Sequence, residues 1–207
     1  MAKLNPDSRF YQGWTLAADV VILNLLTIAA SLPVVTAGAA MAATARVTGQ
    51  MVREEDTYVL ATWWSAFKAN FRQATIGWIP LAILLALTWW ESRIIGNQAE
   101  GTIATLMMAL VILGAVIACA IFVWYIGLVV NFANTASAHA ANAVRLTIGA
   151  LPNTAGIVLI LVLPLLLTAT LPDTIMVVLG FMAVIGFGFA WYMFALFQKP
   201  VLAKLGR

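Results

Sequence analysis

Asp19 is the residue whose chemistry most needs an explanation, because it is a carboxylate inside the long apolar stretch Trp14–Leu32. An ionised side chain deep in a membrane costs about 2.5–3.5 kcal/mol unless it is paired or hydrated. If the chain turns back at Pro33, Asp19 and Arg46 lie at nearly equal depth. We therefore predict an Asp19–Arg46 ion pair, which either locks two helices together or takes part in a proton or ion relay. The other alternative is that Asp19 snorkels to the inner interface.

Known catalytic motifs are missing from the sequence. It contains no phosphate-binding Gly-x-x-x-x-Gly-Lys-Ser/Thr loop, no Gly-x-Ser-x-Gly nucleophile elbow and no His-Glu-x-x-His zinc motif. One histidine and one cysteine are too few for the usual zinc sets. Cys119 is expected to be a small buried side chain, and His139 a polar residue at the membrane interface rather than a proton shuttle. We expect no enzymatic activity, no cofactor and no metal site.

A segment rich in aromatic and basic residues, 63–72, is the most informative candidate surface. Its four aromatic residues fall at helical spacing on one face and its two basic residues on another. This pattern is typical of an amphipathic helix lying along a membrane interface. The segment is either a passive anchor or a docking element for a partner subunit. The residues predicted to dock are Trp63, Trp64, Phe67, Lys68, Asn70, Phe71 and Arg72.

The amino-acid composition indicates that lipid, and not water, surrounds most of this chain. Of its 207 residues 63% are hydrophobic and 9% are charged, and the mean hydropathy is +0.99. A soluble domain is nearer half apolar and a quarter charged, and it could not bury so much apolar surface. The net charge of +3 does not indicate nucleic-acid binding, because the basic residues are thinly spread. We expect an all-α, polytopic transmembrane bundle that contacts membrane lipid and no nucleic acid.

Apolar stretches of about 20 residues, long enough for a helix to cross the membrane core, recur along the chain. Five are clear, at Trp14–Leu32, Gln73–Trp90, Thr102–Val130, Thr154–Leu171 and Thr174–Phe197, and a sixth, Val34–Met51, is rich in Ala and Gly. With six crossings every Lys and Arg except Arg93 falls on one side, whereas five crossings put Lys3 and Arg9 on the other. The positive-inside rule favours six, with both termini on the cytoplasmic side of a bacterial cytoplasmic membrane. Five spans are the alternative.

Six crossings divide one membrane domain, 1–207, into three helical hairpins. The hairpins are 14–51, 73–130 and 154–198, the cytoplasmic connections are 52–72 and 131–153, and the cytoplasmic tails are 1–13 and 199–207. Ser31-Leu32-Pro33 would form the outer turn of the first hairpin, since proline readily ends a helix. We expect this first helix to be retained, not cleaved as a signal peptide.

Small residues and one amide are expected to pack the first helices together. Gly38, Ala39, Ala42 and Ala43 have small-xxx-small spacing, which lets helix backbones approach closely in lipid. Asn24 is expected to hydrogen-bond between helices and not to bind a ligand.

One stretch of sequence recurs. Ser65–Gly77 aligns without gaps with Ser137–Gly149, and seven of the thirteen positions are identical. Both copies would lie on the cytoplasmic side, two spans apart, which predicts a parallel internal repeat. Secondary transporters commonly carry inverted repeats with broken helices, so the pattern counts mildly against that class.

Four stretches in the first part of the chain carry a family resemblance: Asn5-Pro6-Asp7-Ser8, Leu23-Asn24-Leu25-Leu26, Ser31-Leu32-Pro33-Val34-Val35-Thr36-Ala37-Gly38-Ala39 and the stretch from Ala66-Phe67-Lys68 to Gln73-Ala74-Thr75. This resemblance is to the YesL-like family of small bacterial integral membrane proteins of unassigned activity. It covers roughly the first eighty residues and is only hydropathic afterwards, because the family keeps a more charged second amphipathic stretch than Ala138–Gly149. The family offers no catalytic residues to carry over.

Members of that family typically occur beside sugar ABC importers and polysaccharide-degrading enzymes. The resemblance therefore implies a non-enzymatic accessory or assembly subunit of carbohydrate ABC import, with permease and ATPase subunits as partners. Two alternatives stay open: an independent small-solute transporter or channel, and an intramembrane sensor or regulator. Self-association is also left open.

Overall fold

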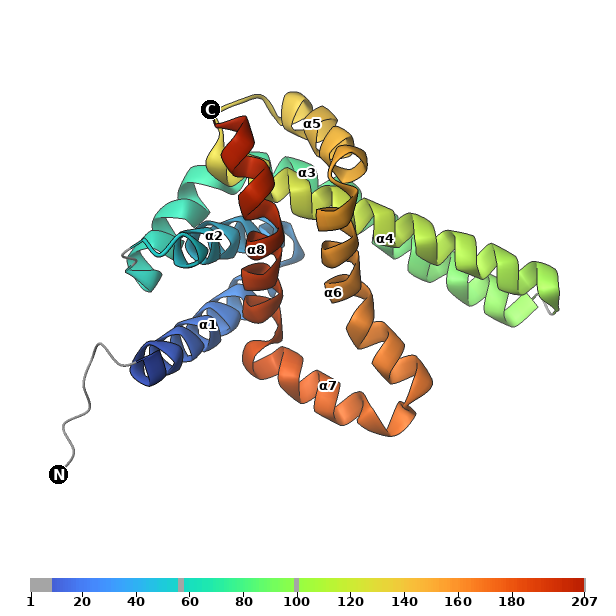
Figure 1. Cartoon of the computed structure of the whole chain (residues 1–207). Coiled ribbons are helices and arrows are strands. Elements are labelled where there is room, and N and C mark those ends of the chain that lie inside the picture. Colours follow the sequence, from blue (N-terminus) through green and yellow to red (C-terminus); the bar gives the residue numbers. More distant parts are fainter. Residues whose placement is uncertain (1–8, 56–57, 99–100, 207) are drawn as a thin grey trace.

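The computed structural model describes residues 9–55, 58–98 and 101–206, and the side chains of 9–12 and 97–98 fall outside this description. Lys3 and the rest of the tail before residue 9, together with Asp56 and Arg207, lie outside the described residues. Within them every regular element is helical (Figure 1). The elements are α1 (Arg9–Ser31), α2 (Ala37–Val52), α3 (Val59–Gln98), α4 (Thr102–Asn131), α5 (Ala136–Gly149), α6 (Leu151–Thr170), α7 (Ile175–Phe181) and α8 (Phe187–Leu205), with 3-10 turns at Val34–Thr36 and Pro172–Thr174 and a π-helical turn at Met182–Gly186. The expected all-helical fold is confirmed.

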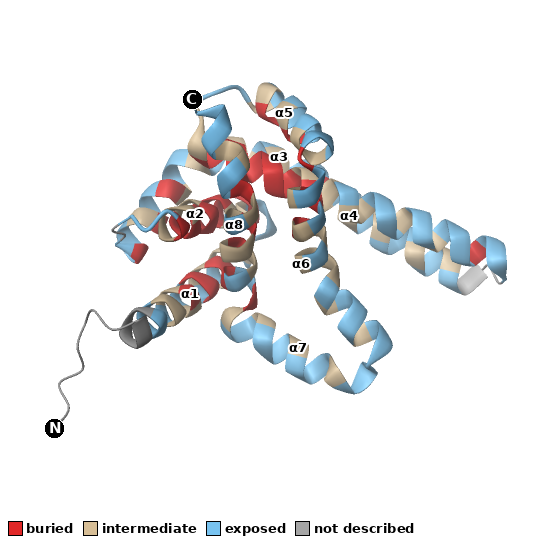
Figure 2. Cartoon of the chain, viewed as in Figure 1, coloured by how far each residue is buried: buried red, intermediate tan, exposed pale blue. Residues whose placement is uncertain are grey.

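Five helical segments of the described chain are long and apolar enough to cross a membrane. They are Gly13–Ser31, Val59–Gly96, Thr102–Asn131, Leu151–Thr170 and Pro172–Leu205. The helices outside the centre are exposed along much of their length (Figure 2), and many of their exposed residues are large and apolar, as in helices that face lipid. The chain is therefore built as a polytopic membrane protein.

The sixth predicted span, Val34–Met51, is not among these segments. Its helix α2 has 16 residues and is about 24 Å long, shorter than a membrane core of roughly 30 Å. Most of α2 is buried against α3, α8 and α1 at the centre of the bundle. Its high content of Ala and Gly therefore serves close packing inside the protein.

The register of the α1–α2 hairpin differs from the predicted one. Pro33 lies in the turn, as expected, but the reversal continues through the 3-10 turn that follows it. The hydroxyls of Thr27 and Thr44 are hydrogen-bonded to each other and set the level of the two helices. This contact places Asp19 toward the level of Val52, at the far end of α2.

The predicted Asp19–Arg46 ion pair is consequently not formed. Arg46 Nη1 donates instead to the carbonyl of Val130 at the end of α4, 3.0 Å away. The ion pair that does form among the described residues is a different one, between Arg53 and Glu55. The prediction was wrong because it assumed a tight turn centred on Pro33.

The aromatic and basic segment 63–72 is not a separate interfacial helix. It forms early turns of α3, which continues for 40 residues through the predicted boundary at Gln73 and past Pro80. No glycine or proline interrupts the residues before Gly77, so nothing in the local sequence stops the helix. The first half of α3 packs along α2, and the second half forms a long hairpin with α4 (Figure 1).

The two copies of the repeat begin similar runs of structure. The copy Ser65–Gly77 lies in α3 and is followed by the rest of α3 and by α4, whereas Ser137–Gly149 forms α5 and is followed by α6, α7 and α8. The second run is broken at Ala150, whose φ of −117° and ψ of 48° leave the helical region. The repeated stretch therefore lies within one continuous helix in the first copy and forms a separate helix, α5, in the second.

Candidate functional site

Asn24 joins α1 to the π-helical turn before α8. It is fully buried, and its Nδ2 donates to the carbonyls of Ala183 at 2.7 Å and Met182 at 3.2 Å. Its Oδ1 accepts from the N–H groups of Phe187 at 2.8 Å and Gly188 at 3.1 Å. In an uninterrupted α-helix the Phe187 N–H would bond to the Ala183 carbonyl. The amide is thus inserted into the hydrogen-bond ladder, which is one established cause of a helix distortion.

A row of buried hydroxyls and one indole continues this polar contact through the centre. Thr44 accepts from Trp63 Nε1 at 3.0 Å and is also bonded to Thr27. Thr48 bonds to the carbonyls of Thr44 and Trp191. Every one of these side chains has a partner within the protein, so the row holds four helices together and forms no open polar path.

Trp63 belongs to this core and not to the predicted docking face. Its side chain is 3% exposed, because it shares a buried stripe of α3 with Val59, Ala66 and Ala74. The stripe follows helical spacing of three and four residues, and its small members let α2 approach. Gly38 of α2 lies close against α3: a Cβ there would stand 2.5 Å from the Cβ of Trp78 and 2.7 Å from the carbonyl oxygen of Ala74. The alternation of small residues with Trp63 was the sequence signal for this face.

The remaining aromatic and basic side chains of the segment form an exposed surface on α3, which we call the aromatic–basic face. Trp64 is 55% exposed and Phe71 37%. The rings of Trp64 and Phe67 stack at 5.5 Å, and Lys68 Nζ lies 5.7 Å from the Trp64 ring centroid. The face consists of Trp64, Phe67, Lys68, Phe71 and Arg72. Asn70 lies beside it and donates to the Ala66 carbonyl.

A second cation–aromatic pair lies near the other end of α3. Arg93 stands 5.3 Å from the ring centroid of Trp89. At 1.5 Å per residue, Trp64 and Trp89 are about 37 Å apart, which is close to the thickness of a membrane core with its interfaces. Tryptophan and basic side chains concentrate at these two levels. The pair of contacts fits a helix that crosses the membrane between them.

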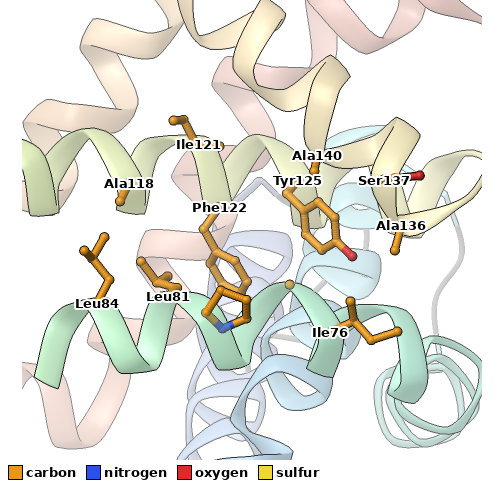
Figure 3. Close-up of a pocket in the computed structure, with 12 residues that line it drawn as sticks. Ile76, Leu81, Leu84, Ala118, Ile121, Phe122, Tyr125, Ala136, Ser137 and Ala140 are labelled. Atoms are coloured by element: carbon orange, nitrogen blue, oxygen red, sulfur yellow. The ribbon is translucent and has the colours of Figure 1, made fainter. Parts of the chain in front are cut away.

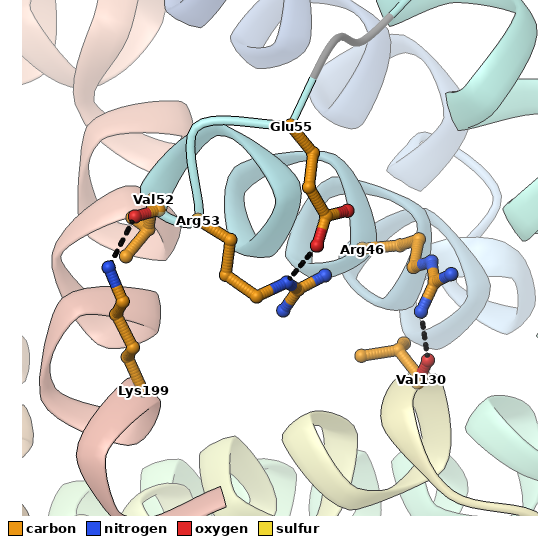
Figure 4. Close-up of polar contacts among 6 residues, drawn as sticks. All are labelled: Arg46, Val52, Arg53, Glu55, Val130 and Lys199. Carbon is orange, nitrogen blue, oxygen red and sulfur yellow. Dashed lines mark hydrogen bonds and ion pairs between the residues drawn. The ribbon is translucent and has the colours of Figure 1, made fainter. Parts of the chain in front are cut away.

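Basic side chains cap helix ends where α2, α4 and α8 meet (Figure 4). Lys199 Nζ donates to the Val52 carbonyl at 2.8 Å, and Arg46 reaches the end of α4. Cations are favourable at the negative ends of helix dipoles. The Arg53 guanidinium donates a hydrogen bond to Glu55 and thereby holds the pKa of that carboxyl below its usual range. We call this region the charged end of the bundle.

A polar groove of about 540 Å³ opens at the charged end between α2 and the first turns of α3. Arg46 is the one ionisable cation that lines it within the described chain. Its other polar lining residues are Gln50, Tyr58, Thr62, Ser65 and Asn70. Gln50 Oε1 is buried and has no hydrogen-bond partner in the part of the chain that the structure describes. The groove thus presents a cation and several hydroxyls, and one of its lining residues, Gln50, has a buried amide oxygen without a partner among the described residues.

A larger cavity of about 620 Å³ between α3, α4 and α5 is almost entirely apolar (Figure 3). Gly77 lies directly against the Tyr125 ring, whose hydroxyl donates to the Gln73 carbonyl at 2.7 Å. Apart from that hydroxyl and Ser137, the lining offers no polar group in the described chain. The cavity can accommodate apolar chains and lacks the groups that a catalytic site needs.

His139 is buried within the protein, with 1% of its surface exposed and its ring edge-on to Tyr125 at 6.2 Å. Burial lowers the pKa of His139, and a hydrogen bond to the Phe132 backbone partly opposes this. Its Nε2 has no hydrogen-bond partner among the described residues. No group of three or more His, Cys, Asp or Glu side chains lies close enough to hold a metal ion in that part of the chain.

Residues 20–91 are similar to the family described as "Protein of unknown function, DUF624". This stretch includes most of α1, all of α2 and much of α3. It therefore contains Asn24, the aromatic–basic face and most of the polar groove. No curated protein and no solved structure matches the chain. The similarity thus covers the first three helices, where the candidate surfaces lie.

Proposed function

We propose that this protein is a non-enzymatic membrane subunit that binds a partner membrane protein through the aromatic–basic face. The observation that carries the proposal is the contiguous aromatic set beside two cations: Trp64 and Phe71 are exposed, and the half-buried Phe67 between them stacks on Trp64 and meets Phe71 edge-on. Aromatic and arginine side chains contribute most of the energy of many protein interfaces. A partner with apolar side chains ringed by carboxylates would fit this surface.

The partner in this proposal is a carbohydrate ABC importer, its permease subunit in particular. Support comes from the resemblance of the first helices to YesL-like proteins; the DUF624 similarity covers the same region, but its description assigns no function. The basic residues at the charged end support a cytoplasmic orientation of the face by the positive-inside rule. In this role the protein would stabilise or assemble the importer, and the ATPase subunit would supply the energy.

An independent transporter is the less favoured function, because the row of polar side chains through the centre of the bundle is already paired. Thr27, Thr44 and Thr48 bond to one another or to main-chain carbonyls, and Asn24 has four main-chain partners. A solute path would need polar groups that face an open passage.

Copurification with matched variants tests the proposal. The tagged protein is extracted in gentle detergent from cells that carry the importer genes, and the recovered proteins are identified by mass spectrometry. We expect permease and ATPase subunits with the wild type and their loss with Trp64→Ala/Lys68→Glu. Trp89→Ala/Arg93→Glu is the control, because it removes the same kind of pair from the other end of the same helix.

The outcomes separate the two ends of α3. Recovery of the partner with the control variant but not with the Trp64/Lys68 variant supports docking at the aromatic–basic face. Equal recovery with both variants would contradict that face, and recovery of the wild-type protein alone would contradict the subunit proposal.

A further inference from the structure

We propose that the polar groove at the charged end binds the phosphodiester headgroup of an anionic, hydroxyl-bearing phospholipid such as phosphatidylglycerol. The groove is formed by Arg46 and Gln50 of α2 and by Thr62 and Ser65 of α3, with Tyr58 just before that helix. Its volume of about 540 Å³ lies within the range of ligand sites, about 300–1,000 Å³. This site does not depend on the proposed partner.

The charge of Arg46 is available to an anion. Within the described chain, the Arg46 guanidinium makes its hydrogen bond through Nη1, which donates to the Val130 carbonyl. Arginine carries five N–H donors in a planar fork, so the others can bind phosphate oxygens in pairs. Glu55, the carboxylate of the neighbouring loop, is already paired with Arg53. No ion pair joins Arg46 to a carboxylate among the described residues, although the charge of Arg46 also contributes to the lowered pKa of Glu55.

The side chain of Gln50 would be stabilised by a hydrogen-bond donor from the ligand. Its buried Oε1 has no partner in the described structure, and a buried acceptor left unpaired is unfavourable. A glycerol headgroup carries hydroxyl donors next to its phosphate, whereas a choline headgroup carries none. The hydroxyls of Thr62 and Ser65 can donate to further phosphate oxygens. Anion and donor together select a phosphate ester with free hydroxyls.

The level of the groove in the membrane favours a lipid as the source of that phosphate. Ser65 and Thr62 share turns of α3 with Trp64 and Lys68, which form the cation–aromatic pair at this end of the helix. Tryptophan and lysine concentrate at the headgroup level of the bilayer. The groove is thus placed where phospholipid phosphates lie.

Native mass spectrometry of the purified protein, titrated in detergent with dioleoylphosphatidylglycerol or dioleoylphosphatidylcholine, tests the proposal. We expect one preferred phosphatidylglycerol for the wild type and at least about tenfold weaker binding for Arg46→Gln, the loss that a charge-assisted hydrogen bond implies. Ala69→Phe fills the groove without removing charge and should weaken binding similarly. Arg145→Gln removes one charge from exposed α5 and should leave binding unchanged.

Wild-type affinity in both Arg46→Gln and Ala69→Phe would overturn the site. If Arg46→Gln does not fold, Ala69→Phe decides alone, because its side chain replaces an exposed alanine. Free glycerol 3-phosphate is the second arm. If glycerol 3-phosphate binds to the groove and the protein shows no preference for phosphatidylglycerol over phosphatidylcholine, the lipid assignment is overturned. The groove would then be a site for soluble phosphate esters.

Discussion

The contact between Asn24 and the π-helical turn gives the sharpest prediction of stability. Asn24→Ala removes an amide whose four hydrogen bonds, at 2.7–3.2 Å, all go to main-chain atoms of the α7–α8 region. Those atoms then lose their partners unless the turn relaxes to a regular α-helix. Relaxation would change the register of α7 relative to α8 and disturb the packing of Gly188 against the Val20 backbone.

The expected cost can be estimated from these bonds. Interhelical hydrogen bonds in membrane proteins contribute about 0.6 kcal/mol each on average, with a maximum near 1.7 kcal/mol. The four bonds of Asn24 therefore predict a loss of about 2–3 kcal/mol in the free energy of unfolding. Asn153→Ala is the matched control, since Asn153 Nδ2 makes one comparable bond, to the Phe197 carbonyl at 2.6 Å. It should cost about 0.6 kcal/mol.

Unfolding by sodium dodecyl sulphate in mixed micelles, followed by tryptophan fluorescence, measures both free energies. Hydrogen exchange adds a local readout, because the amides of Phe187 and Gly188 should exchange faster in Asn24→Ala only. An Asn24→Ala protein no less stable than Asn153→Ala, with unchanged exchange at these amides, would refute the reasoning.

Three further predictions use the same unfolding assay. Gly38→Ala should lower the free energy of unfolding by about 1–3 kcal/mol, because the new Cβ meets a main-chain oxygen of α3 at 2.7 Å. Gly49→Ala is the control and should cost nothing, because its nearest neighbour is a flexible side-chain end at 3.4 Å. Equal effects of the two substitutions would contradict the close approach of α2 to α3. Trp63→Ala should cost about 3–5 kcal/mol as a core truncation, and Trp64→Ala less than about 0.5 kcal/mol; the reverse order would contradict the assigned faces of α3. Burial holds the pKa of His139 below its ordinary value of 6.5, so stability should be complete above that pH and fall as the pH drops below it. His139→Phe should abolish this fall, and a variant with the wild-type pH dependence would contradict it.

Local sequence was sufficient to predict the membrane helices because transfer into lipid depends on the composition of each stretch. The predicted spans Gln73–Trp90, Thr102–Val130 and Thr154–Leu171 lie within or close to the bounds of α3, α4 and α6. A helix in hydrocarbon satisfies its own backbone, so no distant contact is needed to form it. The ends of these helices were less accurate, since α3 begins at Val59 and not at Gln73.

The polar contacts were less accessible to sequence reasoning. Asn24 was expected to form a hydrogen bond between helices, and it does, but its partners are main-chain atoms of a π-helical turn and its flanks. No side-chain pattern in the sequence predicts that turn. Arg46 was paired with Asp19 on an assumed turn, and it bonds instead to the last turn of α4. In each case the partner lies far along the chain, so its identity depends on how the helices cross.

By itself the sequence determined that this chain is a set of apolar helices in lipid, with few and thinly spread charges and without the motifs of an enzyme. The tertiary structure alone decided that the short α2 is enclosed by its neighbours, that Trp63 faces inward and Trp64 outward, and that Arg46 lines a groove. The physical reason is that the two kinds of property depend on interactions over different distances along the chain. Partition between water and lipid acts on each segment separately, whereas burial, register and the pairing of polar groups depend on neighbours brought together by packing.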